Sequence, residues 1–216
     1  MLIPILGPIV VMGWLVTGFW ARRNEKWESF PPFEFSQFDK YLDRGLWPFL
    51  VTFVASLVIT PVMFVMMIPL MIGQAAFFGN QSDASGCLFG VFALLVMFVA
   101  VIVMFGLMLA MVPLKLRAAM TQDFAQAFDL TFAKRFVALT WKEILLSALF
   151  ILATGMLFSV IGMIAFCVGM YLAAVLTSFS WMHLHKQLYA IYLSRGGEPI
   201  PLSPKLSDTP PPLSVI

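Results

Sequence analysis

The two histidines of the chain, His183 and His185, are the residues whose type most readily suggests metal or haem chemistry. On a helix, residues two apart point about 200° away from each other. They cannot ligate one ion from a single helical face, as histidines four apart can. A bis-histidine haem between two helices would need a third histidine on another helix. A histidine–methionine haem is an alternative, but hydrogen bonding of both imidazole rings to lipid headgroups or neighbouring residues is favoured. The sequence therefore predicts no metal site and no cofactor.

Cys87 and Cys167 are the two cysteines, too few for a disulfide framework. Both fall near the predicted outer ends of their helices, which is the oxidising side of a bacterial inner membrane. One hypothesis is a disulfide between them, which a Cα separation above about 7 Å would exclude. Two unpaired, buried thiols are the favoured alternative.

Charged groups are absent from the middle of every predicted membrane span, which contains no Asp, Glu, Lys, Arg or His. Ion pumps, ion-coupled transporters and voltage sensors keep such groups despite an insertion cost of roughly 2.5–3.5 kcal/mol each. The chain also lacks the GxSxG, P-loop, HExxH and Rossmann patterns. The sequence therefore predicts no catalytic residue.

The composition indicates the elements that surround these residues. Apolar residues make up 61% and charged residues 11% of the chain, against roughly half and a quarter in soluble domains. This balance predicts an all-α polytopic transmembrane helical bundle. Segments of about 20 apolar residues can cross the hydrocarbon core, and five are predicted, at about 2–21, 47–72, 87–112, 144–162 and 165–187.

Pro61 lies near the centre of the second span and is predicted to kink it, because proline removes an i to i−4 hydrogen bond. Amphipathic patterns predict interfacial helices at about 36–46 and 116–139, with an ordinary cytoplasmic helix as the alternative for the first. Asp129 could divide the second stretch into two short helices. Residues 1–195 are expected to form one transmembrane domain. Residues 196–216 contain six of the fourteen prolines and predict a disordered cytoplasmic tail.

In this predicted topology the basic residues all fall in segments on one side of the membrane. All thirteen Lys and Arg residues, and all acids but Asp83, lie there. Basic loops stay in the cytoplasm during insertion, so the N-terminus is predicted outside and the C-terminus inside a bacterial inner membrane. The mixture of both charges on this side predicts no nucleic-acid partner.

Two sets of residues are predicted to contact lipid or other helices. A stripe with four-residue spacing is best explained by lipid contact or packing under the bundle, with a partner-binding groove as the alternative. Small residues in the last two spans allow helices to approach closely. The sets are Phe124, Phe128, Phe132 and Phe136, and Gly155, Gly162 and Gly169.

Three stretches together resemble a known family. They are IPILGPIVVMGWLVTGFWARR (3–23), FPPFEFSQFDKYLDRGLWPFLV (30–51) and SFSWMHLHKQLYAIYL (178–193). These segments are similar to the prokaryotic membrane-protein family known as domain of unknown function 4013. The chain departs from that pattern at Arg44, which separates Asp43 from Gly45, and at Lys186, where the family often has glycine. The resemblance implies a multi-helix membrane domain and no established activity.

The leading hypothesis for function is a non-catalytic accessory or scaffold subunit of an inner-membrane assembly. Its expected partners are membrane lipids and either other membrane-protein subunits or further copies of this chain. The alternative is a carrier for an apolar or lipid-like substrate, since the Pro61 kink and nearby methionines could form a deformable pocket. These methionines are Met63, Met66, Met67 and Met71.

Overall fold

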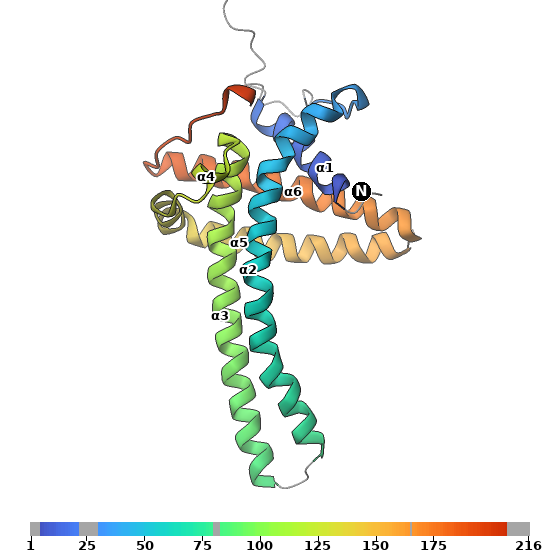
Figure 1. The fold of residues 1–216 in the computed structure, drawn as a ribbon, viewed down its shortest axis with the longest axis vertical. Coiled ribbons are helices and arrows are strands. Elements are labelled where there is room, and N and C mark those ends of the chain that lie inside the picture. The colour runs from blue at the N-terminus through green and yellow to red at the C-terminus, as the bar shows by residue number, and fades with distance from the viewer. Residues whose placement is uncertain (1–4, 22–29, 80–82, 165, 207–216) are drawn as a thin grey trace, which may run out of the picture. The chain divides into compact units, whose positions relative to one another are not determined.

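The protein is all-α in the computed structural model, which describes residues 5–21, 30–79, 83–164 and 166–206 (Figure 1). Across these four ranges every regular element is a helix and none is a strand, which confirms the predicted class. The elements are α1 (Leu6–Val16), the π-helix η1 (Thr17–Ala21), the 3-10 turn η3 (Phe35–Gln37), α2 (Phe38–Gly79), α3 (Asp83–Thr121), α4 (Phe124–Ala127), α5 (Leu130–Ile164), α6 (Phe166–Ser194) and the 3-10 turn η4 (Pro204–Leu206).

The chain divides into two compact units. The first comprises Met1–Val51 and Ala110–Ile216, and we call it the packed unit. The second comprises Thr52–Leu109, and we call it the hairpin unit. The long helices α2 and α3 each contribute residues to both units.

Three helical stretches are long and apolar enough to cross a membrane. They are Phe35–Ile68, Gly90–Thr121 and Leu130–Ile164, with mean hydropathies of 2.4, 3.0 and 2.5. These stretches give the chain the helices of an integral membrane protein. The predicted first span corresponds to the shorter apolar helix Leu6–Ala21, and the predicted fifth span corresponds to α6, which has 29 residues.

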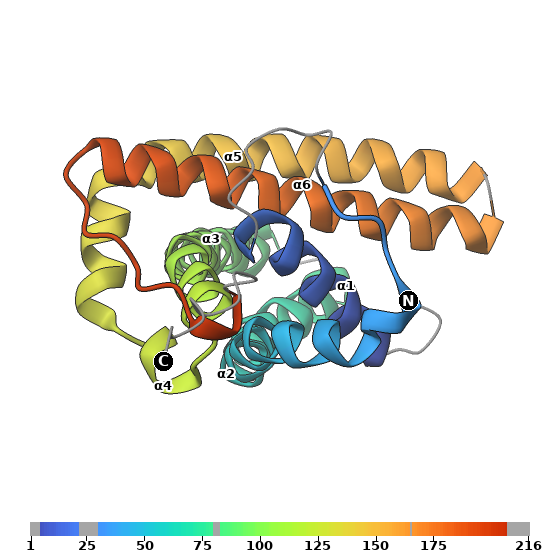
Figure 2. The same cartoon turned by 90° about the horizontal axis from the view of Figure 1, so that it is seen from above.

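In the hairpin unit, α2 and α3 run in opposite directions and lie side by side in both views (Figures 1 and 2). The less exposed side chains recur every three or four residues, the spacing of a narrow contact seam between two helices. The side chains that follow this spacing are Ala55, Ile59, Met63 and Met66 on α2, and Ala93, Val96, Ala100, Val103 and Leu107 on α3; a few others, such as Val54 and Phe105, are also partly buried. Most of the remaining apolar surface of both helices is exposed.

In the packed unit, α5 and α6 form an antiparallel pair (Figure 2). We expected the chain to reverse near Gly162; α5 ends at Ile164 and α6 begins at Phe166. A Cβ added at Gly162 would lie 2.9 Å from the carbonyl oxygen of Gly169. The two helices therefore approach closely where both residues lack a side chain.

The N-terminal helix α1 crosses the beginning of α2 at a second glycine pair. A Cβ on Gly13 would overlap the carbonyl oxygen of Tyr41, and a Cβ on Gly45 would overlap that of Ile9. Because the backbones themselves are in contact, only glycine fits at either position. Two of the three segments that resemble the family meet at this crossing.

The separate interfacial helix predicted at 36–46 is wrong, because α2 continues without interruption from Phe38 into the membrane-length stretch. Pro48 does not interrupt this helix, although its nitrogen cannot donate to the carbonyl oxygen of Arg44. Instead the side-chain nitrogen of Gln122 donates to that oxygen at 3.2 Å. The helix also continues through Pro61, and the predicted kink there stays a prediction.

The stretch predicted at 116–139 is divided more than we expected, although the break anticipated at Asp129 is present. α3 extends to Thr121 and ends at Gln122, which has a left-handed backbone with φ 53°. Asp123 then caps α4 by accepting hydrogen bonds from the backbone of Ala125 and Gln126. Asp129 caps α5 in the same way, with the backbone nitrogen of Thr131 at 2.9 Å. The capping aspartates therefore divide this stretch into three helical pieces.

Candidate functional site

Arg44 is the most buried charged side chain described in the packed unit, with 2% of its surface exposed. Its guanidinium donates to Thr17 Oγ1 at 3.0 Å and to the carbonyl oxygen of Lys205 at 2.6 Å. Thr17 lies at the start of the π-helix η1 and also donates to Gly13 at 2.8 Å. A buried charge requires such hydrogen bonds. Arg44 thereby joins α1, α2 and the C-terminal segment.

The C-terminal segment Gly197–Leu206, which we call the strap, is packed against the helices (Figure 2). Its backbone nitrogens at Glu198 and Ile200 donate to the hydroxyl oxygens of Tyr192 and Tyr189, at 3.1 and 2.8 Å. Leu206 has 0% of its surface exposed and joins a cluster with residues of α1.

The disordered tail predicted at 196–216 is therefore wrong for the described residues up to 206. Composition predicted disorder because prolines and polar residues cannot form a core of their own. The strap instead uses a core that other helices provide. Residues 207–216 lie outside the described residues.

A cavity of about 180 Å³ lies inside the packed unit between α1, α2, α3 and α6. Met12, Pro48 and Met182 form its apolar wall. Lys115, Ser178, Trp181 and His185 contribute its polar groups. The cavity therefore combines one ammonium group with an imidazole, and none of the described residues that line it carries a carboxylate.

Two of the polar groups of this cavity, Lys115 and His185, lack hydrogen-bond partners in the described part of the chain. Lys115 is partly buried and forms no hydrogen bond or ion pair with any described residue. His185 is 6% exposed, and its Nε2 is buried without a hydrogen-bond partner among the described residues. The ring of Trp181 lies against the imidazole, with centroids 5.3 Å apart. Unpaired buried donors of this kind can bind a ligand of opposite charge.

The two histidines have different surroundings. The Nε2 atom of His183 is 2.9 Å from the side-chain nitrogen of Gln187, and its ring is near that of Phe19. His185 lines the cavity instead. Over the described ranges, no group of three or more His, Cys, Asp or Glu side chains could hold a metal ion.

The phenylalanine stripe lies inside the packed unit. Phe132 and Phe136 are buried and stack around Tyr192, with Arg117 over the ring of Phe132 at 5.0 Å. Phe124 and Phe128 pack against a cluster of Val51, Ala118 and Ala127. In the structure the four side chains therefore pack within the unit, which is one of the two interpretations of their spacing.

The three predicted contact glycines belong to the α5–α6 pair. Gly162 meets Gly169 as described above, and a Cβ on Gly155 would lie 3.9 Å from the methyl carbon of Thr177. The close helix approach that we expected thus occurs within the chain. The side chains of Cys87 and Cys167 lie outside the described side chains, so the disulfide stays a prediction.

Sequence reasoning missed Arg44, Lys115 and His185 as a set of buried polar groups. Arg44 separates Asp43 from Gly45, which are adjacent in the family pattern. This departure indicates a role for Arg44 that the family pattern does not explain. Lys115 follows Pro113 at the end of a long apolar run and was assigned only to the basic cytoplasmic side. No local pattern marks these groups, because they lie on different helices, and only Lys115 and His185 meet at the cavity.

These features define an α-helical integral membrane protein whose buried polar groups gather in one unit. The chain belongs to the family described as protein of unknown function (DUF4013), whose model matches residues 1–170. The family resemblance is thereby confirmed for its first two segments, while the third segment, 178–193, lies beyond the match. No match was found among curated proteins or among solved structures.

Proposed function

We propose that this protein is a non-catalytic accessory or scaffold subunit of an inner-membrane assembly. The observation that supports this best is the hairpin unit. Its two helices share only a narrow seam, so most of their apolar surface is available for lateral contacts. Lipid can cover such a surface, and so can the helices of another subunit.

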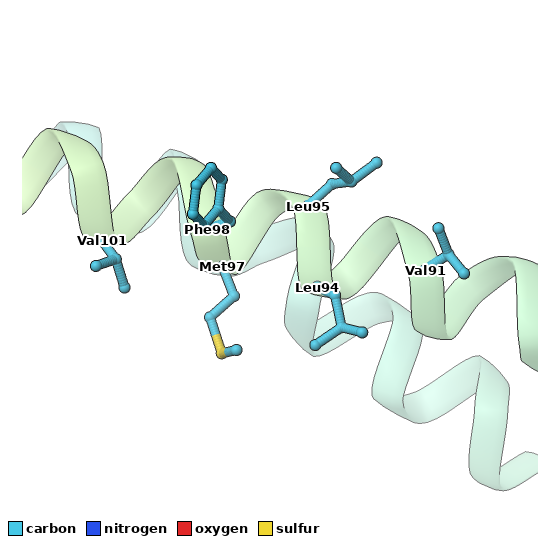
Figure 3. A pocket seen from close by; sticks show the side chains of 6 residues that line it. All are labelled: Val91, Leu94, Leu95, Met97, Phe98 and Val101. Carbon is cyan, nitrogen blue, oxygen red and sulfur yellow. The ribbon is translucent and has the colours of Figure 1, made fainter.

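A shallow groove on α3 is the clearest surface for such a contact. Six side chains form it, and all come from α3 (Figure 3). They are Val91, Leu94, Leu95, Met97, Phe98 and Val101. At 100° per residue this set lies on the side of α3 opposite the seam. The groove is almost entirely apolar, as expected for helix–helix packing in a bilayer.

An open glycine lies beside this surface. Gly106 is exposed, and a Cβ built on it would meet nothing within 4 Å. Four residues later comes Ala110, which gives a pair of small residues on one side of the helix. Small residues at this spacing let a second helix approach closely. Unlike Gly162, Gly106 has no neighbour among the described residues that occupies this space.

The proposed location is a bacterial inner membrane, with the N-terminus outside and the C-terminus in the cytoplasm. All thirteen Lys and Arg residues belong to the packed unit and none to the hairpin unit. Positive residues remain on the cytoplasmic side during insertion. This distribution supports a cytoplasmic position for the polar ends of the helices.

The alternative function, a carrier for an apolar substrate, has less support. It requires the methionines that follow Pro61 to surround a pocket. Met63 and Met66 lie on the seam, whereas Met67 and Met71 are 42% and 69% exposed. The methionines are thus divided between the seam and the outer surface of α2.

Site-specific photocrosslinking in cells tests the scaffold proposal. A photoreactive residue at Leu95 or Phe98, in the groove, should give a covalent adduct of higher mass that mass spectrometry identifies as another subunit or a second copy. The same residue at Ile59, on the seam, is the matched control and should react within the chain. Absence of protein adducts at both groove positions, together with a monomer in mild detergent, would contradict the proposal.

Cysteine labelling tests the orientation. In a chain whose native cysteines are replaced by serine, Gln126→Cys should be protected from a membrane-impermeant maleimide applied outside intact cells. Gln81→Cys, in the predicted outer loop, should be labelled under the same conditions. Labelling of position 126 from outside would overturn the proposed topology.

A further inference from the structure

We propose that the cavity between α1, α2, α3 and α6 binds a phosphate-bearing anionic group, which in the membrane is the headgroup of an anionic lipid. This inference goes beyond a scaffold role, because it assigns a ligand to a defined site. It depends on residues of the packed unit alone. Its starting point is the ammonium group of Lys115 beside the unpartnered imidazole of His185.

Lys115 lines the cavity without a carboxylate partner among the described residues. Four other basic residues of the packed unit form ion pairs with carboxylates: Arg117 with Asp129, Arg135 with Glu198, Arg195 with Glu143, and Lys205 with Asp43. Lys115 pairs with no described carboxylate, although it is partly buried in a cavity with an apolar wall. An ammonium group removed from water is unfavourable without a counter-charge. A bound anion would supply that charge.

His185 provides a second donor for the same ligand. A neutral imidazole donates from one ring nitrogen, and the tautomer follows the partner that is present. A phosphate oxygen near Nε2 would select the tautomer that donates from this atom and would satisfy the buried nitrogen. Ser178 is already engaged, because its hydroxyl donates to the carbonyl oxygen of Ala174 at 2.8 Å. The two donors are therefore Lys115 and His185.

The size and walls of the cavity favour a headgroup over a whole lipid. Its volume of about 180 Å³ is below the roughly 300–1,000 Å³ of pockets that enclose a drug-sized ligand. A phosphate with adjoining carbons can enter while the acyl chains remain outside. Met12, Pro48 and Met182 would contact the carbons.

The depth of the site fits the same ligand. Lys115 lies at the predicted cytoplasmic end of α3, and tryptophans such as Trp181 prefer the interface between lipid and water. Basic pockets between membrane helices on the cytoplasmic side are suited to phosphate headgroups. Free inorganic phosphate has the same recognition chemistry, so the test must distinguish the two sources.

The test is a titration of the purified full chain in mild detergent, followed by native mass spectrometry and by thermal unfolding. The probes are short-chain phosphatidylglycerol, short-chain phosphatidylcholine and inorganic phosphate. The variants are Lys115→Met, His185→Gln and the matched control Lys142→Met, which removes the same charge from an exposed position outside the cavity. Lys115→Met removes an unpaired ammonium, so the variant is expected to fold.

Phosphatidylglycerol should bind the unaltered chain and raise its melting temperature, whereas phosphatidylcholine should not. Lys115→Met should weaken this binding about tenfold or more, as expected for the loss of a charge-assisted hydrogen bond. His185→Gln should weaken it less, and Lys142→Met should leave it unchanged. If inorganic phosphate binds and depends on Lys115 while phosphatidylglycerol does not, the site is confirmed with free phosphate as its source. Equal affinities in Lys115→Met and Lys142→Met would overturn the proposal.

Discussion

The packed unit and the hairpin unit share two long helices but use their side chains differently. In the packed unit the crossings are close, the polar groups are paired across the sequence, and both ends of the described chain take part. In the hairpin unit the helices share one narrow seam, and the only charged residue in the range Thr52–Leu109 is Asp83. The burial of specific groups therefore stabilises the packed unit, whereas the stability of the hairpin unit depends on its apolar environment.

The largest expected difference between the units comes from one added methyl group. Gly45→Ala in the packed unit should destabilise the protein by more than about 3 kcal/mol, because the new Cβ would overlap the backbone of α1. Gly90→Ala in the hairpin unit meets nothing within 4 Å and should be neutral or stabilise α3 by about 0.5–1 kcal/mol. Thermal unfolding followed by circular dichroism in detergent measures both. Similar effects at the two positions would contradict the comparison.

A smaller effect is expected from the strap. Leu206→Ala should cost about 3 kcal/mol, because it leaves a cavity in a fully buried cluster. Leu202→Ala removes the same atoms from a side chain that is 44% exposed, and it should change stability by less than about 0.5 kcal/mol. The same unfolding measurement applies. If both variants behave alike, the strap does not form part of the core.

Arg44 tests whether the polar junction holds the strap in place. Arg44→Met removes hydrogen bonds from a charged donor and should cost about 2 kcal/mol. The control, Arg135→Met, breaks an exposed ion pair with Glu198 and should cost less than about 1 kcal/mol. Limited proteolysis after residue 196 is the specific measurement, since release of the strap should accelerate cleavage. Cleavage at the same rate in both variants would show that Arg44 does not hold the strap in place.

The smallest effect concerns acid stability at the start of α5. The hydrogen bond from the backbone of Phe132 lowers the pKa of Asp129, and the charge of Arg117, 3.0 Å away, acts in the same direction. A lowered folded-state pKa stabilises the protein above the unfolded value, near 3.9, and this contribution is lost as the pH falls through the folded value.

The comparison with Asp129→Asn isolates this charge, because asparagine retains a capping oxygen. The unaltered chain should melt at a higher temperature than the variant at pH 6, and the difference should vanish once the pH falls below the lowered folded-state pKa of Asp129. A difference that persists at low pH would assign the effect to the cap and not to the charge.

The sequence predicted the helical class and the apolar stretches because both depend on composition and length. It predicted helix boundaries poorly where a side chain distant in the sequence forms a hydrogen bond that local patterns do not reveal. The boundary predicted near residue 46 is absent, and Gln122 satisfies the carbonyl group of Arg44 that Pro48 leaves free. Thr140 and Glu143 have the spacing of a capping box, yet α5 runs through both, and Thr140 donates to the carbonyl oxygen of Phe136 instead.

The candidate site was less accessible to sequence reasoning. Lys115 and His185 are 70 positions apart in the sequence, and each alone resembles an ordinary residue near a membrane interface. Only the crossing of α1, α2, α3 and α6 brings their side chains to one cavity. The strap was missed for a related reason. Its proline content shows that it cannot form a core by itself, but does not show that other helices provide the core in which Leu206 is buried.

The burial of Leu206 beside Leu15 and Val16 has a consequence for biosynthesis. A ribosome releases the first helix long before it makes the strap, since chains emerge from the N-terminus at about 5–20 residues per second. Until translation passes position 206, α1 lacks one of its final neighbours. A stop codon a few residues earlier would therefore damage the beginning of the molecule, although the first helix itself would be intact.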